Sequence, residues 1–333
     1  MNIAILGAGA WGTALAISLS SRHCVTLWTH NPEHAALLAQ SRANQRYLPG
    51  FSLPESVRIE AGMGQALQTA DLVLAVVPTA GFRGVLKQSV AAGLRVPLLW
   101  ACKGFEAGTA KLLHQVAAEE LAGRVPCGVL SGPSFAREVA AGLPTAITLA
   151  SQDAAFARTA AAELHAPRLR IYHSDDVAGV EVGGAVKNVM AIAAGICDGL
   201  HLGYNARAAL ITRGLAEITR LGIALGGKPE TFMGLTGLGD LVLTCTGDLS
   251  RNRTVGLKLA QGESLEKILR ELGHTAEGVS TAREVARMAD SLGVEMPITQ
   301  EVCRVLYEGM PAKAAVEELL NREPKPENSR EKI

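Results

Sequence analysis

The sequence predicts an α/β domain built around a mostly parallel sheet, followed by an all-α domain. Three observations carry this prediction. Short apolar runs alternate with helix-like stretches in the first half, a glycine turn joins the first strand to the first helix, and long helix-like stretches dominate from about Glu181. Strands separated by helical patterns are typical of βαβ units and hence of parallel sheets. A chain of 333 residues is long enough for two such domains.

The glycine turn follows the apolar run of residues 2–6 and reads Gly7-x-Gly9-x-x-Gly12. In such a turn the first glycine permits the tight bend, the second lets the backbone approach a pyrophosphate, and the third lets helix and strand pack closely. The N–H groups at the start of the helix then face the phosphates. A second strand-like run follows at residues 24–28. This context favours a Rossmann-type dinucleotide-binding fold over an ordinary glycine-rich turn.

The other strands are expected where further short apolar runs occur. Several runs are continuously apolar, as in strands that are buried on both faces of a sheet. The predicted strands are residues 2–6, 24–28, 71–78, 96–102, 127–131, 145–150 and 168–172. Ligands bind at the carboxyl ends of such strands. Lys103 and Ser134 follow two of these ends and are therefore candidate ligand contacts.

The second half is expected to consist of helices separated by glycine-rich breaks. The predicted helices are residues 181–198, 205–225, 251–261, 264–271, 279–292 and 297–308, with breaks at 226–227 and 234–239. We therefore divide the chain into a dinucleotide-binding domain, residues 1–178, and an all-α substrate domain, residues 179–320. Residues 321–333 are charged and contain proline, and we expect them to form a mobile tail.

Composition and charge narrow the class of function. The net charge is zero, so no overall field attracts the chain to nucleic acid or to an anionic membrane. No cysteine pair has CxxC spacing and no histidine pattern suggests a metal, so we expect no metal site. Cys24 and Cys197 lie in apolar runs and are expected to be buried thiols. Residues 182–197 contain Lys187 and Asn188 and are too short and too polar to span a bilayer, so we expect a cytoplasmic protein without membrane insertion.

The end of the second predicted strand bears on the choice of nicotinamide cofactor. NAD-preferring versions of this fold place an Asp or Glu there, about 20 residues after the glycine turn, to bind the ribose 2′-hydroxyl. Here the first carboxylate is Glu33, which follows Pro32, whereas His30 or Asn31 can hydrogen-bond either cofactor. We hypothesise that the chain accepts NADPH as well as NADH. In a stronger form of this hypothesis, it prefers NADPH. In the alternative interpretation, His30 is only a surface residue at the strand end.

Lys187 is the most informative residue of the second half. On a helix it shares a face with Gly183, Gly184 and Ala191, one turn away, and with Ala194, two turns away, so another surface or a ligand can approach this face closely. A lysine is rarely buried without a partner. A partly buried lysine is usable as a proton donor and acceptor near neutrality. The alternative is a snorkelling lysine on an amphipathic helix.

Two further candidate segments lie after buried strands. Lys103 could polarise a substrate carbonyl or bind a phosphate, or be an ordinary solvated lysine. Gly132 and Ser134 belong to Ser131-Gly-Pro-Ser-Phe-Ala136, whose backbone N–H groups can contact a ligand; a plain β-turn before a helix is the alternative.

Two more candidate segments lie in the helical half. Asp240 closes the break at 234–239, where its carboxylate could orient a lysine, bind a hydroxyl or only cap the next segment. Ser250, Arg251 and Asn252 open a helix-like stretch, and a serine cap with an arginine suits a phosphate dianion. An ordinary N-cap with exposed arginines is equally compatible with the spacing.

The whole pattern resembles bacterial NAD(P)-dependent glycerol-3-phosphate dehydrogenase over about residues 3–310. The matching runs are residues 7–15, 101–104, 130–136, 183–188, 205–207, 213–217, 237–241, 243–246, 250–252, 276–278 and 295–299. The resemblance implies reversible hydride transfer from NADPH or NADH to dihydroxyacetone phosphate, which gives sn-glycerol 3-phosphate for phospholipid biosynthesis. It also implies a homodimer.

The resemblance further implies roles for individual residues. Lys187 corresponds to the proton donor and acceptor. Substrate contacts correspond to Lys103, Gly132, Ser134, Lys187, Asp240, Ser250, Arg251 and Asn252. Cofactor contacts correspond to Ala10, Trp11, His30, Lys103, Ala136, Arg251, Thr275 and Glu277, beside the glycines at 7, 9 and 12. The chain departs from the family pattern at Cys102, where Ser or Thr is common, and at His30-Asn31.

Two alternatives remain at this point. A related reductase of the β-hydroxyacid, 6-phosphogluconate or ketopantoate type also carries a lysine on a helix of its second domain. Ser250-Arg251-Asn252 together with Gly239-Asp240 favours the glycerol-phosphate family. A nonenzymatic dinucleotide sensor would need neither the lysine nor the phosphate cluster.

Overall fold

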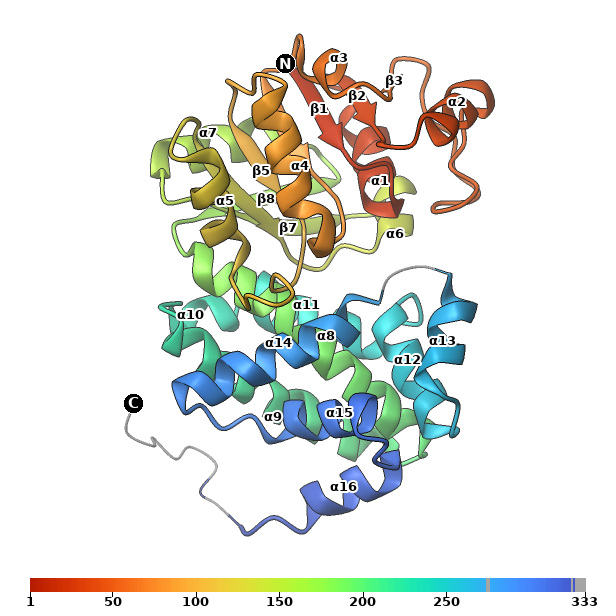
Figure 1. Cartoon of the computed structure of the whole chain (residues 1–333), viewed down its shortest axis with the longest axis vertical. Coiled ribbons are helices and arrows are strands. Elements are labelled where there is room, and N and C mark those ends of the chain that lie inside the picture. Colours follow the sequence, from red (N-terminus) through yellow and green to blue (C-terminus); the bar gives the residue numbers. More distant parts are fainter. Residues whose placement is uncertain (274–275, 325, 327–333) are drawn as a thin grey trace. The chain divides into compact units, whose positions relative to one another are not determined.

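The structure is a computed structural model that describes residues 1–273, 276–324 and 326. The chain forms two compact units (Figure 1). Unit 1 contains Met1–Glu106 and Lys111–Glu181, and unit 2 contains Ala107–Ala110 and the residues from Val182 onward. The division after Glu181 falls inside one helix. Most of the predicted tail, residues 321–333, lies outside the described residues.

Unit 1 is organised around one sheet of eight strands in the part of the chain that the structure describes. The strands are β1 (Asn2–Leu6), β2 (Cys24–Trp28), β3 (Arg58–Glu60), β4 (Leu72–Ala75), β5 (Leu98–Trp100), β6 (Cys127–Ser131), β7 (Thr145–Ala150) and β8 (Leu169–Ser174). Their order is β3-β2-β1-β4-β5-β6-β7-β8, and only the β6–β7 pairing is antiparallel. The strand order reverses between β1 and β4, which is where ligands bind in such sheets. The predicted Rossmann-type fold is confirmed.

Helices cover both faces of this sheet. Ile3 and Ile5 of β1 pack into one apolar cluster, whereas Ala4 and Leu6 pack into another. Because successive strand residues point to opposite faces, each face has its own core. The helices of unit 1 are α1 (Ala10–Leu19), α2 (Pro32–Ser41), α3 (Met63–Leu67), α4 (Thr79–Ala91), α5 (Leu113–Leu121), α6 (Ala136–Ala140), α7 (Ala154–Leu164) and the first turn of α8 (Val177–Gly199).

The structure corrects several predicted details of unit 1. The edge strand β3 was not predicted, because its three residues include only one apolar side chain, Ile59. The predicted strands 71–78 and 96–102 are shorter, and their flanking residues belong to loops at the sheet edge. Cys24 was expected to be buried and is exposed, because it starts β2 ahead of the buried Val25. Cys197 is buried, as predicted.

Unit 2 is all-α among its described residues, as predicted. Its helical elements, apart from the rest of α8, are α9 (Gly203–Ala224), α10 (Pro229–Phe232), η1 (Leu235–Gly239), α11 (Asp240–Thr246), α12 (Arg251–Ala260), α13 (Leu265–Leu272), α14 (Glu277–Leu292), α15 (Pro297–Tyr307) and α16 (Ala312–Leu320). The element η1 is a single wide turn, in which the Gly239 N–H donates to the Gly234 carbonyl.

Helix α8 is the central helix of unit 2. The prediction that this apolar segment is too short to span a membrane was wrong, since α8 has 23 residues and a mean hydropathy of 1.4. By length and composition alone it passes as a membrane span, but its apolar window is entirely buried by protein. Its apolar composition is therefore explained by its position in the core.

Candidate active site

Lys187 lies on α8 with its side chain 8% exposed. Its Nζ is 2.5 Å from Oδ1 of Asp240, whose side chain is 1% exposed, and it donates a 3.0 Å hydrogen bond to Oγ1 of Thr244. The Thr244 hydroxyl in turn donates to the Asp240 carbonyl at 2.6 Å. Both partners lie one turn apart on α11. The buried ammonium is thus held by a carboxylate and a hydroxyl, and it is not a snorkelling lysine.

The glycines beside Lys187 explain how α11 comes so close. A Cβ on Gly183 would lie 2.8 Å from the Thr236 carbonyl oxygen in η1, so only glycine allows this approach. A Cβ on Gly237, within η1, would likewise lie 2.0 Å from the Phe232 carbonyl oxygen. The segment predicted as a glycine-rich break is therefore a tightly packed turn. It leads directly into α11, and so places Asp240 against α8.

A second buried polar contact joins α8 to α12. Asn252 donates from Nδ2 to Oδ1 of Asn188 at 2.9 Å, and its own Oδ1 accepts the Gly278 N–H at 3.0 Å. Both asparagines are less than a tenth exposed. A Cβ on Gly195 would meet the Arg253 carbonyl oxygen at 2.0 Å, so α8 and α12 pack backbone to backbone. The start of α12 is thereby held against Asn188, the residue next to Lys187 on α8.

The predicted phosphate cluster divides into two kinds of residue. Ser250 is buried and caps α12 through its Oγ, which accepts the Arg253 N–H at 3.3 Å. Arg253 pairs with Asp198 at 2.8 Å and with Asp248 at 3.0 Å. Arg251 keeps a solvent-accessible side chain, yet protein atoms surround enough of it to lower the pKa of its guanidinium, an effect that the Glu277 carboxylate opposes. Arg251 is therefore the arginine suited to an anion.

In unit 1, three predicted residues meet at one carbonyl group. The Gly132 carbonyl accepts a 3.0 Å hydrogen bond from Nζ of Lys103 and a 2.9 Å hydrogen bond from Oγ of Ser134. Gly132 has φ +135°, and a Cβ there would lie 3.0 Å from the Ile147 Cα, so the turn requires glycine. Ala136 begins α6 just after this turn.

The glycine turn fits the pyrophosphate of a dinucleotide. Gly7 has φ +125°, and a Cβ there would lie 2.2 Å from the Val76 carbonyl oxygen. A Cβ on Gly12 would lie 1.9 Å from the Gly7 carbonyl oxygen. A Cβ on Gly9, by contrast, would meet nothing within 4 Å. The turn therefore leaves open space where Gly9 precedes Ala10 and Trp11, the first residues of α1, whose N–H groups suit phosphate.

Asn44 supports this turn and was not predicted. Its side chain is 1% exposed and donates from Nδ2 to the Ala8 carbonyl at 2.9 Å and to Oγ1 of Thr13 at 2.8 Å. The contact joins residues more than thirty positions apart in the sequence, so no local pattern could have indicated it. Thr244 falls within the matching run 243–246, but the sequence alone indicates no role for it.

The end of β2 is the predicted contact for the adenosine ribose. His30 is exposed, and its ring centroid is 6.4 Å from that of Trp28. Asn31 caps α2, where its Oδ1 accepts the His34 N–H at 3.0 Å. Of the two predicted side chains, Asn31 is thus engaged in the fold and His30 faces solvent. The newly found β3 places Glu60 beside Trp28 in the sheet.

Two predicted cofactor contacts remain, Glu277 and Thr275. Glu277 is the first residue of α14 and is half-buried. Thr275 lies outside the described residues.

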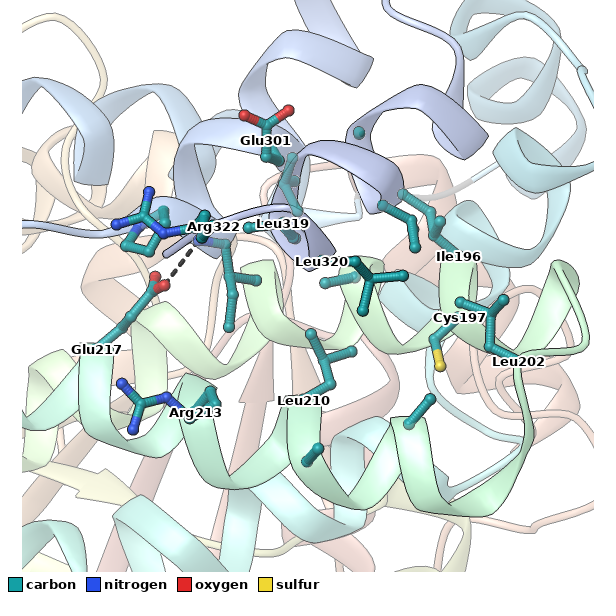
Figure 2. Close-up of a pocket in the computed structure, with 18 of the residues that line it drawn as sticks. Ile196, Cys197, Leu202, Leu210, Arg213, Glu217, Glu301, Leu319, Leu320 and Arg322 are labelled. Atoms are coloured by element: carbon teal, nitrogen blue, oxygen red, sulfur yellow. Dashed lines mark hydrogen bonds between the residues drawn. The ribbon is translucent and has the colours of Figure 1, made fainter. Parts of the chain in front are cut away.

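A cavity of about 720 Å³ lies elsewhere in unit 2, and none of the predicted site residues is among the residues that line it (Figure 2). Its walls come from α8, α9, α15 and α16, with Leu210, Leu319 and Leu320 beside charged groups such as Arg213. Glu217 at its edge accepts the N–H groups of Ile298 at 2.7 Å and Thr299 at 3.2 Å. Burial raises the pKa of Glu217 to about 7, against these hydrogen bonds. Its observed contacts cap α15.

Comparisons with known proteins agree along nearly the whole chain. Residues 2–157 match the model for the NAD-dependent glycerol-3-phosphate dehydrogenase N-terminus, and residues 176–317 match that for the C-terminus. A glycerol-3-phosphate dehydrogenase [NAD(P)+] of Nitrosospira multiformis is 64% identical over 98% of this chain and 99% of its own. One from Nitrosomonas eutropha is 61% identical over 97% of this chain and 98% of its own.

Solved structures agree as well. The crystal structure of glycerol-3-phosphate dehydrogenase from Coxiella burnetii has a TM-score of 0.93 at 45% identity, covering 96% of this chain and 99% of that one. These matches favour the glycerol-phosphate family over the related reductases of the β-hydroxyacid, 6-phosphogluconate and ketopantoate types. The chain, which carries the glycine turn of residues 7–12 and the buried Lys187–Asp240 ion pair, belongs to the NAD-dependent glycerol-3-phosphate dehydrogenase family.

Proposed function

We propose that Lys187 is the proton donor and acceptor in the reversible reduction of dihydroxyacetone phosphate to sn-glycerol 3-phosphate. One observation carries this assignment: the Lys187 ammonium is buried and held 2.5 Å from Asp240 and 3.0 Å from Thr244. A buried lysine with a fixed direction is the kind of group that general acid–base catalysis requires.

The chemistry follows from the charge that develops on the substrate. Bound NADPH or NADH supplies the hydride to the carbonyl carbon. The carbonyl oxygen gains negative charge, which a nearby ammonium stabilises before giving it a proton. In the reverse direction the lysine takes that proton back. Asp240 and Thr244 hold the Lys187 side chain in place, so that it need not reorient during the reaction.

We assign the phosphate of the substrate to the start of α12. Arg251 supplies a bidentate guanidinium, and the N-terminus of α12, capped by Ser250 and fixed by Asn252, adds oriented N–H groups. Binding energy at this nonreacting group fixes the reacting carbonyl. The resemblance adds Lys103, Gly132 and Ser134 to the substrate contacts, and the shared Gly132 carbonyl is consistent with their acting together.

We assign the dinucleotide to the turn formed by Gly7, Gly9 and Gly12 and to α1 behind it. The open space at Gly9 supports the assignment. His30 is proposed to contact the ribose, and Ala136 and Glu277 follow from the resemblance. We further propose that the chain works in the cytoplasm as a homodimer and supplies glycerol phosphate for phospholipids. Light scattering on the purified protein would give twice 34.8 kDa for the dimer and 34.8 kDa for a monomer.

The test is turnover of dihydroxyacetone phosphate by the purified chain, followed as loss of NADPH or NADH absorbance. Lys187→Met should lower kcat by about 10²–10⁴ and leave the Kd for NADPH nearly unchanged. Lys313→Met, which changes a lysine that is 79% exposed, is the matched control and should retain full activity. Cofactor binding without turnover of this substrate would favour a dinucleotide sensor. Turnover of a 3-hydroxyacid or of ketopantoate instead would favour one of the related reductases.

A further inference from the structure

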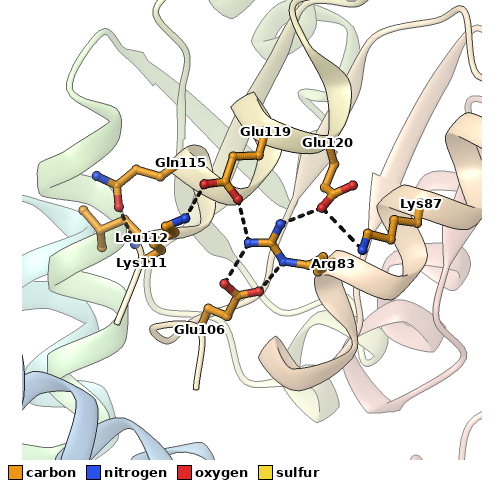
Figure 3. Close-up of polar contacts among 8 residues, drawn as sticks. All are labelled: Arg83, Lys87, Glu106, Lys111, Leu112, Gln115, Glu119 and Glu120. Atoms are coloured by element: carbon orange, nitrogen blue, oxygen red, sulfur yellow. Dashed lines mark hydrogen bonds and ion pairs between the residues drawn. The ribbon is translucent and has the colours of Figure 1, made fainter. Parts of the chain in front are cut away.

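One guanidinium in unit 1 holds three carboxylates (Figure 3). Arg83 on α4 contacts Glu106 through Nε at 2.6 Å and through Nη2 at 2.8 Å, so the two side chains form a two-pronged fork. It also contacts Glu119 at 2.8 Å and Glu120 at 2.5 Å, both on α5. These carboxylates raise the pKa of Arg83, and Glu106 has the largest effect. Arg83 is therefore always charged and multiply held.

The contacts with Glu106 and Glu119 lie beside a short loop, residues 107–110, which we call the strap. Glu106 precedes the strap and Lys111 follows it, and the Glu106 N–H donates to the Lys111 carbonyl at 2.9 Å. The Lys111 ammonium contacts Glu119. Arg83 and Glu119 together thus hold both ends of the strap. Within it, Gly108 and Ala110 have positive φ, +82° and +54°, so the chain turns sharply.

The strap itself belongs to unit 2, although the residues that flank it, Glu106 and Lys111, belong to unit 1. Its Gly108 N–H donates to Oε1 of Glu284 on α14 at 3.1 Å, and Glu284 is 5% exposed. The chain therefore leaves unit 1 after Glu106 and returns at Lys111. The Arg83 cluster lies at both of these crossings.

The segment that leads from β5 to the strap carries Lys103, three residues before Glu106. Lys103 lies three residues after the end of β5, and its Nζ donates to the Gly132 carbonyl at 3.0 Å. Between them Phe105 is 3% exposed and anchors the loop in the core. Residues 101–106 are thus fixed at one end by the sheet and at the other by the Arg83–Glu106 fork.

We propose that Arg83 is a positioning residue for the reaction, which sets the backbone of the loop from Lys103 to Lys111 through its fork with Glu106. This rests on the substrate role proposed for Lys103. Lysine cannot replace arginine here, because an ammonium cannot form two parallel hydrogen bonds with one carboxylate. The contacts with Glu119 and Glu120 join α4 to α5. Of the contacts that Arg83 itself makes, only the fork ends on a residue of the loop from Lys103 to Lys111.

A matched pair of variants separates positioning from helix packing. Glu106 and Glu120 share the partner Arg83, and each has a side chain that is 16% exposed. Glu106→Gln should raise the KM for dihydroxyacetone phosphate about 10-fold, within the ~10²-fold that a misplacement of about 1 Å can cost. Glu120→Gln should leave the KM within about twofold. Both variants should have similar urea midpoints, so that a difference in KM reports position and not folding.

A direct readout of the loop completes the test. Limited trypsin cleavage after Lys103 or Lys111 should be faster in Glu106→Gln and in Arg83→Lys than in wild type or in Glu120→Gln. Equal kinetics and cleavage for Glu106→Gln and Glu120→Gln would overturn the proposal while leaving the proposed activity intact. Lys103→Met is the separate check on the substrate role. A wild-type KM in that variant would overturn that role and, with it, this inference.

Discussion

Lys187 and Asp240 form an ion pair of 2.5 Å between α8 and α11, with 8% and 1% of their side chains exposed. The pair depends on backbone packing that only glycine allows, since Gly183 meets the Thr236 carbonyl. Taking two charges out of water is costly, and the cost is offset only when partner and hydrogen bonds are both in place. This pair has both, because Thr244 adds a hydroxyl. Its burial therefore points to a use that outweighs the cost.

Breaking this pair on one side should destabilise the protein. Asp240→Asn leaves the Lys187 charge buried without its carboxylate, which typically costs about 3–5 kcal/mol of unfolding free energy. The double variant Lys187→Met/Asp240→Leu removes both charges and should recover most of that loss. Both variants should be inactive. Urea unfolding with activity assays checks this, and a double variant less stable than Asp240→Asn would contradict it.

The three glycines of the dinucleotide turn should respond differently to alanine. Gly12→Ala forces a Cβ to within 1.9 Å of the Gly7 carbonyl oxygen and should destabilise unit 1 by about 1–3 kcal/mol. Gly9→Ala has room for its Cβ and should cost less than about 1 kcal/mol of stability. Because that Cβ occupies the space proposed for the pyrophosphate, the Kd for NADPH should rise about 10-fold or more.

The control for this pair is Gly64→Ala, on α3, where a Cβ also meets nothing within 4 Å. It should leave the Kd for NADPH unchanged and raise the stability by no more than about 1 kcal/mol, as expected for alanine in place of glycine in a helix. A normal Kd in Gly9→Ala, measured by fluorescence or calorimetry, would remove the pyrophosphate from this turn.

The strands were predictable from the sequence where local apolar pattern decides the structure. β1, β2, β6 and β7 have the predicted ends, because each coincides with a short, mainly apolar run in the sequence. β3 was not predictable, because its Arg58 and Glu60 flank one apolar residue and it forms by pairing with β2. The same limit applies to the antiparallel pairing of β6 with β7, which depends on chain direction in space and not on residue pattern.

The candidate site was predictable as a set of residues and not as a set of contacts. Lys187, Asp240 and Arg251 were singled out because charges in glycine-rich or apolar surroundings are unusual. Asn44 was not, because a buried asparagine shows its value only when its distant partners, such as Ala8, are known. Residues 234–239 were interpreted as a loop, because glycine runs indicate flexibility locally, whereas here they allow close backbone packing.

Glu217 should make stability depend on pH. Its folded pKa of about 7 lies above the ordinary value of 4.5, so the folded state binds the proton more tightly. This contribution is fully present below pH 4.5 and is lost as pH rises to about 7, by about 3 kcal/mol in total. Urea unfolding of wild type against Glu217→Gln from pH 5 to 8 should show wild type losing relative stability over this interval. Parallel curves would assign the dependence to other groups.

Arg251 should affect the phosphorylated substrate more than the chemistry. Arg251→Lys keeps the charge at the start of α12 but loses the bidentate contact with phosphate. We expect the KM for dihydroxyacetone phosphate to rise about 10-fold, with a much smaller change in kcat, as for loss of binding shared by ground and transition states. Arg287→Lys changes an arginine that is 57% exposed on α14 and serves as the control. A fall in kcat at unchanged KM would place Arg251 at the reacting end of the substrate.

The choice between NADPH and NADH should depend on the end of β2. No acidic residue follows Trp28 until Glu33, and His30 is exposed there, so we expect NADPH to be used with at least the kcat/KM of NADH. His30→Asp should reverse this preference by about 10-fold or more. A new carboxylate about 4 Å from a 2′-phosphate costs about 1 kcal/mol per charge pair even in water, and it can also bind a 2′-hydroxyl. His173→Asp, an exposed histidine on β8, makes the same change of charge away from this strand end and should leave the cofactor ratio unaltered. Steady-state kinetics with both cofactors tests this expectation. A large preference for NADH in the wild-type protein would contradict it. The carboxylate that binds the ribose 2′-hydroxyl would then come from another group, with Glu60 of β3 as the first candidate.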